Sequence, residues 1–132
     1  MSSAERLLIS YGTIVLIAGF VLGTVLGMLR MRSPVIRTLN AAHVETLMQA
    51  AMHLGLAFAF GAVGFTSTAA MWAAVLLVVG SAMQAIGATL NWTTHTRDQF
   101  AERSPGWILN SLSTFVSWPG LILAAWGILT HL

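Results

Sequence analysis

Four apolar stretches occupy most of this chain of 132 residues, and each is long enough to cross a lipid bilayer as a helix. A transmembrane helix needs about 20 apolar residues to cross about 30 Å of hydrocarbon. The stretches predict helices over residues of about 7–29, 34–63, 68–91 and 106–130. With 57% hydrophobic and 8% charged residues, the chain lacks the charges of a soluble domain, which has about 25%. We therefore predict one all-α domain over residues 1–132, an integral membrane four-helix bundle.

The arginines predict the orientation of this bundle in the membrane. Arg6 precedes the first stretch, whereas the other five lie at the opposite end of the bundle, at positions Arg30, Arg32, Arg37, Arg97 and Arg103. Short loops rich in arginine stay in the cytoplasm. The sequence therefore predicts a multi-pass protein of the bacterial cytoplasmic (inner) membrane with both termini on the outer side. Serine followed by proline is typical of a helix start, so we expect the second helix to begin at Ser33 and Pro34.

Two composition features exclude classes of function. The chain has no cysteine, which excludes disulfides, thiolate metal sites and cysteine nucleophiles. A formal net charge of +2 gives no basis for binding nucleic acid. Any metal would have to be held by histidine, methionine, a carboxylate or a cofactor.

Small and polar residues recur at helical spacing and predict packing faces. Gly19, Gly23 and Gly27 form a pattern that lets two helix backbones approach closely, within the bundle or between protomers. The third helix has one such face, formed by Gly80, Gln84, Gly87 and Asn91. The fourth helix has a polar stripe, formed by Asn110, Ser113, Thr114 and Ser117. These side chains either form hydrogen bonds between helices or line a polar pocket. Pro119, followed by Gly120, predicts a bend in the fourth helix.

The second helix has more polar residues than packing requires. Glu45, Gln49 and His53 recur every four residues and share one face, and an acid buried at bilayer depth costs about 2.5 to 3.5 kcal/mol. His43 lies about 200° around the helix axis from Glu45. We therefore expect one face to line the interior of the bundle and the other to meet a cofactor or a neighbouring subunit. Glu45 is either an acid of the active site or the partner of a buried histidine.

Several short motifs resemble one family. The chain is similar to the hydroxylaminobenzene mutases in its length, its four spans, the arginines after the first helix and the run Ala41-Ala42-His43-Val44-Glu45. Further points of resemblance are Leu90-Asn91-Trp92 at the end of the third helix and Trp126-Gly127 in the fourth. Those small bacterial membrane proteins are in turn similar to styrene oxide isomerases.

The resemblance implies a cofactor, a ligand and an assembly. Styrene oxide isomerases are oligomers, taken here as trimers, that hold haem b through one histidine near the start of the second helix. Ferric iron acts there as a Lewis acid. Carried over, His43 would bind the haem iron and Gln49 would stand for an asparagine that places the substrate. The chain departs from the pattern at Thr46, where the family has glycine, and near Thr89, where the epoxide isomerases contribute a tyrosine.

These observations predict an intramembrane isomerase of a small aromatic compound. The leading reaction converts an N-arylhydroxylamine to an aminophenol, with Glu45, Gln49, Asn91 and Asn110 as candidate catalytic residues. The amides would orient the substrate and stabilise charge in a water-poor pocket. One alternative is the isomerisation of an epoxide to an aldehyde by the same haem. Another is a small non-enzymatic membrane protein, such as a transporter subunit or assembly factor. A homo-oligomer in the bilayer is expected in the enzymatic cases.

Overall fold

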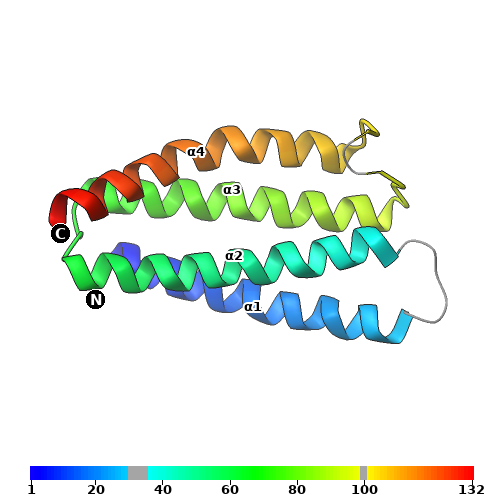
Figure 1. Ribbon diagram of the computed structural model, residues 1–132, viewed down its shortest axis with the longest axis horizontal. Helices are drawn as coiled ribbons and strands as arrows, with labels where there is room; N and C mark the ends of the chain where they lie inside the picture. Colours follow the sequence, from blue (N-terminus) through cyan, green and yellow to red (C-terminus); the bar gives the residue numbers. More distant parts are fainter. Residues whose placement is uncertain (30–35, 99–100) are drawn as a thin grey trace.

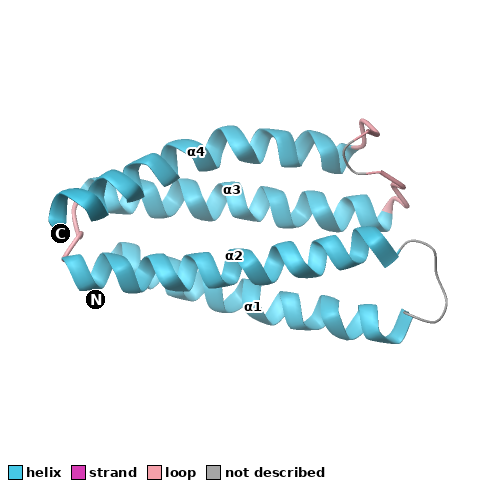
Figure 2. Ribbon diagram, viewed as in Figure 1, coloured by secondary structure: helices cyan, strands magenta, loops and turns pink. Residues whose placement is uncertain are grey.

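The computed structural model describes residues 1–29, 36–98 and 101–132 and places them in four long helices. These are α1 (Ser3–Leu29), α2 (Ile36–Val63), α3 (Thr68–Thr93) and α4 (Pro105–His131). Figure 2 shows that helix accounts for nearly all of the described chain and that loops only join the helices. Each helix is long and apolar enough to cross a membrane, which confirms the predicted all-α bundle with four candidate spans.

Helix caps explain where two of the helices begin. At α1, the Ser2 hydroxyl accepts from the Glu5 amide at 3.2 Å while Glu5 Oε1 accepts from the Ser2 amide at 3.1 Å. This reciprocal capping box starts the helix at Ser3, before the apolar stretch that begins at about residue 7. At α4, the Ser104 hydroxyl accepts from the Trp107 amide, and Pro105 occupies the first helical position. The predicted start of the second helix at Ser33 and Pro34 lies outside the described residues.

The helices form two closely packed pairs, α1 with α2 and α3 with α4. The two pairs contact each other mainly through α2 and α3. In Figure 1 both termini and the turn between α2 and α3 lie at one end of the bundle. The described connection between α3 and α4 lies at the other end. Phe60 and Phe65 are fully buried near the end with the termini, in a core made otherwise mostly of alanine and leucine. Leu39, Ala42 and Ala88 are buried towards the other end.

Two of the three glycines in the first packing motif receive side chains from α2. A Cβ at Gly19 would lie 2.6 Å from Leu47 Cδ2, and one at Gly23 would lie 2.6 Å from His43 Cε1. A Cβ at Gly27 would meet no atom of the described residues within 4 Å. The pattern thus serves packing within the bundle at Gly19 and Gly23, as one of its two interpretations predicted.

The polar and small-residue faces of α3 and α4 meet each other. A Cβ at Gly80 would contact Ser113 and Ser117, and a Cβ at Gly87 would lie 2.8 Å from the Gly106 carbonyl oxygen. These glycines let the two backbones approach closely, so both faces serve the α3–α4 interface. Figure 1 shows α4 bending part-way along its length, in keeping with the internal Pro119.

The orientation predicted from the arginines is testable with single cysteines in this cysteine-free chain. Thr66 and Ala101 are both exposed and belong to connections at opposite ends of the bundle. In intact cells, we expect a membrane-impermeant thiol reagent to label Thr66→Cys and to label Ala101→Cys only after the membrane is opened. Labelling of Ala101→Cys in intact cells would contradict the orientation.

Candidate functional site

His43 lies half-buried in the groove between α1 and α2. Its Nδ1 is 2.7 Å from the Gly19 carbonyl oxygen, and its ring covers Gly23. Because a carbonyl oxygen only accepts, Nδ1 carries the proton of the neutral ring and Nε2 keeps its lone pair. Histidines that bind metals are oriented in this way, by a hydrogen bond from the second ring nitrogen to a carbonyl or carboxylate. His53 and His131 make the same contact with a carbonyl oxygen of their own helix, whereas the His43 contact reaches from α2 to α1.

Glu45, Gln49 and His53 face inward from α2, away from this groove. Gln49 and His53 are buried, and Gln49 Oε1 accepts a hydrogen bond of 2.7 Å from Ser81 of α3. One nitrogen or oxygen of each of the three residues is buried without a hydrogen-bond partner: Glu45 Oε2, Gln49 Nε2 and His53 Nε2. The predicted separation of His43 from this stripe is confirmed.

A small apolar pocket lies at the level of His43 between α1, α2 and α3. Its volume is about 260 Å³, and its lining residues are Ala18, Leu22, Thr46, Ala85, Ile86, Thr89 and Leu90. Ala18 and Leu22 immediately precede Gly19 and Gly23, the two glycines under His43, and Thr46 lies about one turn after His43. The pocket and the histidine therefore occupy neighbouring sides of the same α1–α2 contact.

The pocket wall is polar only at its two threonines, and both hydroxyls donate within their own helices. Thr46 Oγ1 donates to the Ala42 carbonyl at 2.5 Å, and Thr89 Oγ1 donates to the Ala85 carbonyl at 2.8 Å. Both residues thus offer the pocket methyl groups and oxygen acceptors, without a free donor.

Gln49 and Ser81 lie about one helical turn beyond this pocket, towards the end with the termini. Gln49 follows Thr46 on α2, and Ser81 precedes Ala85 on α3. Their hydrogen bond uses Gln49 Oε1, which leaves the Gln49 Nε2 group as a buried donor without a partner. Among the predicted catalytic residues, Gln49 is therefore the one with a free hydrogen-bond donor close to the pocket along α2.

His53 is fully buried deeper in the stripe. Its Nδ1 lies 2.7 Å from the Gln49 carbonyl oxygen, and its ring packs edge-on against Tyr11 of α1 at a centroid distance of 4.9 Å. The Leu77 carbonyl of α3 also faces the ring without reaching hydrogen-bond geometry at Nε2. His53 thus bridges three helices.

Asn91 and Asn110 lie at the interface of α3 and α4. Asn91 is fully buried, and its Oδ1 accepts a hydrogen bond of 2.5 Å from Ser104, the capping residue of α4. Asn110 packs over Gly87. Asn91 Nδ2 and Asn110 Oδ1 are buried without partners, and neither residue hydrogen-bonds to Gln49. The observed contacts of both asparagines are therefore packing contacts between these two helices, and a catalytic role for them stays a prediction.

Sequence patterns did not identify the apolar lining of the pocket or two of its polar neighbours. Ala18, Leu22 and Ile86 look like any other lipid-facing or core residue in sequence. Ser81 becomes a partner of Gln49 only through the register of α2 against α3. Tyr11 carried a weak signal, because it is the single tyrosine of the chain and lies in an apolar helix.

Over residues 1–29, 36–98 and 101–132, no three histidine or acidic side chains gather in a group that could hold a metal ion directly. Haem differs, because one proximal imidazole is enough to bind its iron. His43 fits that requirement by its partial exposure and by the contact of its Nδ1 with a carbonyl oxygen of the neighbouring helix α1. Comparison with protein-family models, curated proteins and solved structures finds no match to the chain.

Proposed function

We propose that this chain is an intramembrane isomerase that rearranges a small aromatic compound, most plausibly an N-arylhydroxylamine, with haem b held by His43. The observation that carries the proposal is the hydrogen bond from His43 Nδ1 to the Gly19 carbonyl, next to an apolar pocket of about 260 Å³. When bound, ferric haem would supply a Lewis acid that weakens a nitrogen–oxygen or carbon–oxygen bond of the substrate.

The pocket supports a small aromatic substrate. A cavity of about 150 Å³ lined by apolar side chains can bind benzene, so about 260 Å³ accommodates one substituted ring. The pocket is open at its side, so its apolar lining together with the surrounding hydrocarbon would have to keep out the water that traps the positive charge on the ring when the oxygen leaves. The donor of Gln49 Nε2 is suited to hold the oxygen or nitrogen of the substrate.

The reaction we propose needs no electron carrier. Conversion of an N-arylhydroxylamine to an aminophenol breaks one nitrogen–oxygen bond, forms one ring carbon–oxygen bond and moves one ring proton to nitrogen. Glu45, which is adjacent to Thr46, is the buried acid nearest the pocket along α2 and the candidate to carry that proton.

The mutase reaction is preferred to epoxide isomerisation because of two pocket residues. Thr46 and Thr89 both line the pocket. By the resemblance, Thr46 stands where the family has glycine, and the region near Thr89 has no tyrosine like the one in the styrene oxide isomerases. Neither threonine has a free donor for an epoxide oxygen, whereas the tyrosine of the epoxide enzymes does.

Oligomerisation belongs to the same proposal. Cavities of about 260 and 350 Å³ are too small to enclose a porphyrin. We propose that a second copy of the chain covers the part of a porphyrin that the described residues around the half-exposed His43 leave open. The number of copies would be three if the resemblance to the isomerases holds.

The test is an assay of purified, haem-supplemented protein with phenylhydroxylamine and with styrene oxide. We expect aminophenol from the first substrate and at least tenfold slower conversion of the second, a difference of about 1.4 kcal/mol in activation free energy. Faster conversion of styrene oxide would favour the epoxide reaction. Conversion of neither substrate by haem-loaded protein would contradict the proposed reactions.

Glu45→Gln tests the role of the buried acid. The substitution preserves shape and removes the charge, so we expect unchanged expression and haem content with about a hundredfold lower turnover. The matched control is Glu102→Gln in the exposed connection before α4, which should keep full turnover. Full turnover of Glu45→Gln would remove Glu45 from the reaction, and loss of folded protein would assign it a structural role.

A further inference from the structure

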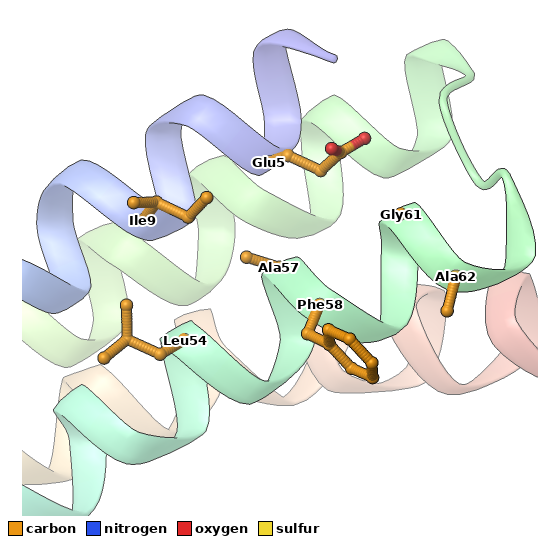
Figure 3. Close-up of a pocket in the computed structure, with 7 residues that line it drawn as sticks. All are labelled: Glu5, Ile9, Leu54, Ala57, Phe58, Gly61 and Ala62. Atoms are coloured by element: carbon orange, nitrogen blue, oxygen red, sulfur yellow. The ribbon is translucent and has the colours of Figure 1, made fainter. Parts of the chain in front are cut away.

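A second cavity lies between α1 and α2, near the end of the bundle that holds both termini. Figure 3 shows Glu5 and Ile9 of α1 on one side and Leu54, Phe58 and Gly61 of α2 on the other. The groove has a volume of about 350 Å³ and opens sideways from the bundle. Its walls are apolar apart from the Glu5 carboxylate, so it has one polar end and one apolar end.

The helix cap holds the Glu5 carboxylate in place and leaves one of its oxygens available. Oε1 accepts from the Ser2 amide at 3.1 Å and from the Ser2 hydroxyl at 2.7 Å. No hydrogen bond of the described residues ends on Oε2, which lies 3.4 Å from the position that a Cβ would take at Gly61. The missing side chain at Gly61 therefore leaves room beside a free carboxylate oxygen.

The apolar part of the groove extends from Glu5 towards the middle of the membrane. On α2, Leu54 lies about two turns deeper than Gly61. On α1, Ile9 lies about one turn deeper than Glu5. Phe58 is 79% exposed and forms an outer wall. A ligand that fits this shape has a cationic head at the membrane boundary and an apolar chain below it.

We propose that this groove binds one acyl chain and the ammonium head of phosphatidylethanolamine from the surrounding leaflet. A primary ammonium can donate a hydrogen bond to Glu5 Oε2, whereas the trimethylammonium of phosphatidylcholine has no N–H to donate. Arg6 does not line the groove, but it is the next residue of α1 and is exposed, so its guanidinium is available to the phosphate of the same headgroup. A carboxylate and a guanidinium at adjacent positions thus complement the two charges of this lipid. The inference does not depend on the proposed enzymatic function.

The experiment is competitive lipid retention by the delipidated full chain, measured by native mass spectrometry. The probes are phosphatidylethanolamine, phosphatidylcholine and phosphatidylglycerol with identical oleoyl chains, in equal amounts. One exposed ion pair supports a preference of about three- to fivefold for phosphatidylethanolamine over phosphatidylcholine. Equal retention of these two lipids by the wild type, or stronger retention of phosphatidylglycerol, would overturn the proposal.

Variants separate the head from the chain. Glu5→Gln should abolish the preference for phosphatidylethanolamine while total lipid retention stays unchanged. Gly61→Leu fills the groove and should lower the retention of all three lipids, and Ala62→Leu, on the same wall, should act likewise if Gly61→Leu does not fold. The matched control is Gly55→Leu on the same helix, where a Cβ meets no other atom within 4 Å. A preference that survives Glu5→Gln, or equal losses in the groove variants and in Gly55→Leu, would overturn the proposal.

Discussion

Replacing His43 with alanine is expected to yield folded protein that lacks haem and turnover. A single axial imidazole would be the only bond from the protein to the iron, so its removal should lower haem occupancy by about tenfold or more. The Gly19 carbonyl and the space over Gly23 would remain, but they offer no metal ligand. The measurement is the ratio of haem absorbance to protein absorbance after purification.

Two other histidine variants serve as controls for this result. His95→Ala changes an exposed loop position and should keep both haem and turnover. His53→Ala removes a fully buried ring that packs on Tyr11, so it should lower stability and keep haem in the protein that folds. A normal haem spectrum in His43→Ala would show that another group binds the iron. Loss of haem in His53→Ala alone would move the ligand to the polar stripe.

Replacing Gly106 with alanine is expected to be among the most destabilising single-methyl changes in the chain. A Cβ at this position would clash with the Gly87 carbonyl oxygen and with Asn91 Oδ1. The carbonyl belongs to the backbone of α3, so α3 and α4 would have to separate. Overpacking of this kind costs about 1 to 3 kcal/mol. Thermal unfolding in detergent, followed by circular dichroism, measures the effect.

Gly27→Ala is the matched control for Gly106→Ala. It adds the same methyl group to a transmembrane helix, at a glycine with open space around it. Alanine favours helix over glycine by about 0.8 to 1 kcal/mol, so this variant should unfold at the same temperature or slightly higher. Equal destabilisation of both variants would contradict the close α3–α4 contact at Gly106.

Most of the fold was predictable because helix formation in a membrane depends on local composition. Four long apolar stretches were enough for the four helices, and glycine spacing indicated the faces at Gly19, Gly23 and Gly87. The starts of α1 and α4 were less predictable, since the caps at Ser2 and Ser104 lie in polar segments that hydrophobicity does not mark. Gly27 belongs to the same pattern as Gly19 and Gly23 but meets no side chain. Spacing alone does not show where a neighbouring helix diverges.

The sequence predicts the candidate residues one by one, whereas their arrangement depends on the fold. The period of α2 correctly separated His43 from Glu45 and Gln49, because that relation lies within one helix. Relations between helices depend on register, which no single stretch contains. For this reason the Gln49–Ser81 hydrogen bond, the apolar pocket beside Thr46 and the contacts of Asn91 and Asn110 between α3 and α4 emerged only from the three-dimensional fold.

The most direct test of the central claim is the absorption spectrum of the wild-type protein, purified in detergent from cells supplied with haem precursor. The proposed function requires a Soret band at a stoichiometry near one haem per chain, or a fixed fraction of one if copies share it. The band should shift when a small anionic ligand such as cyanide binds to the iron. Wild-type protein could instead be colourless and stay so after incubation with excess haemin. That result would contradict the proposed function and would favour a non-enzymatic membrane protein with a buried polar stripe at Glu45, Gln49 and His53.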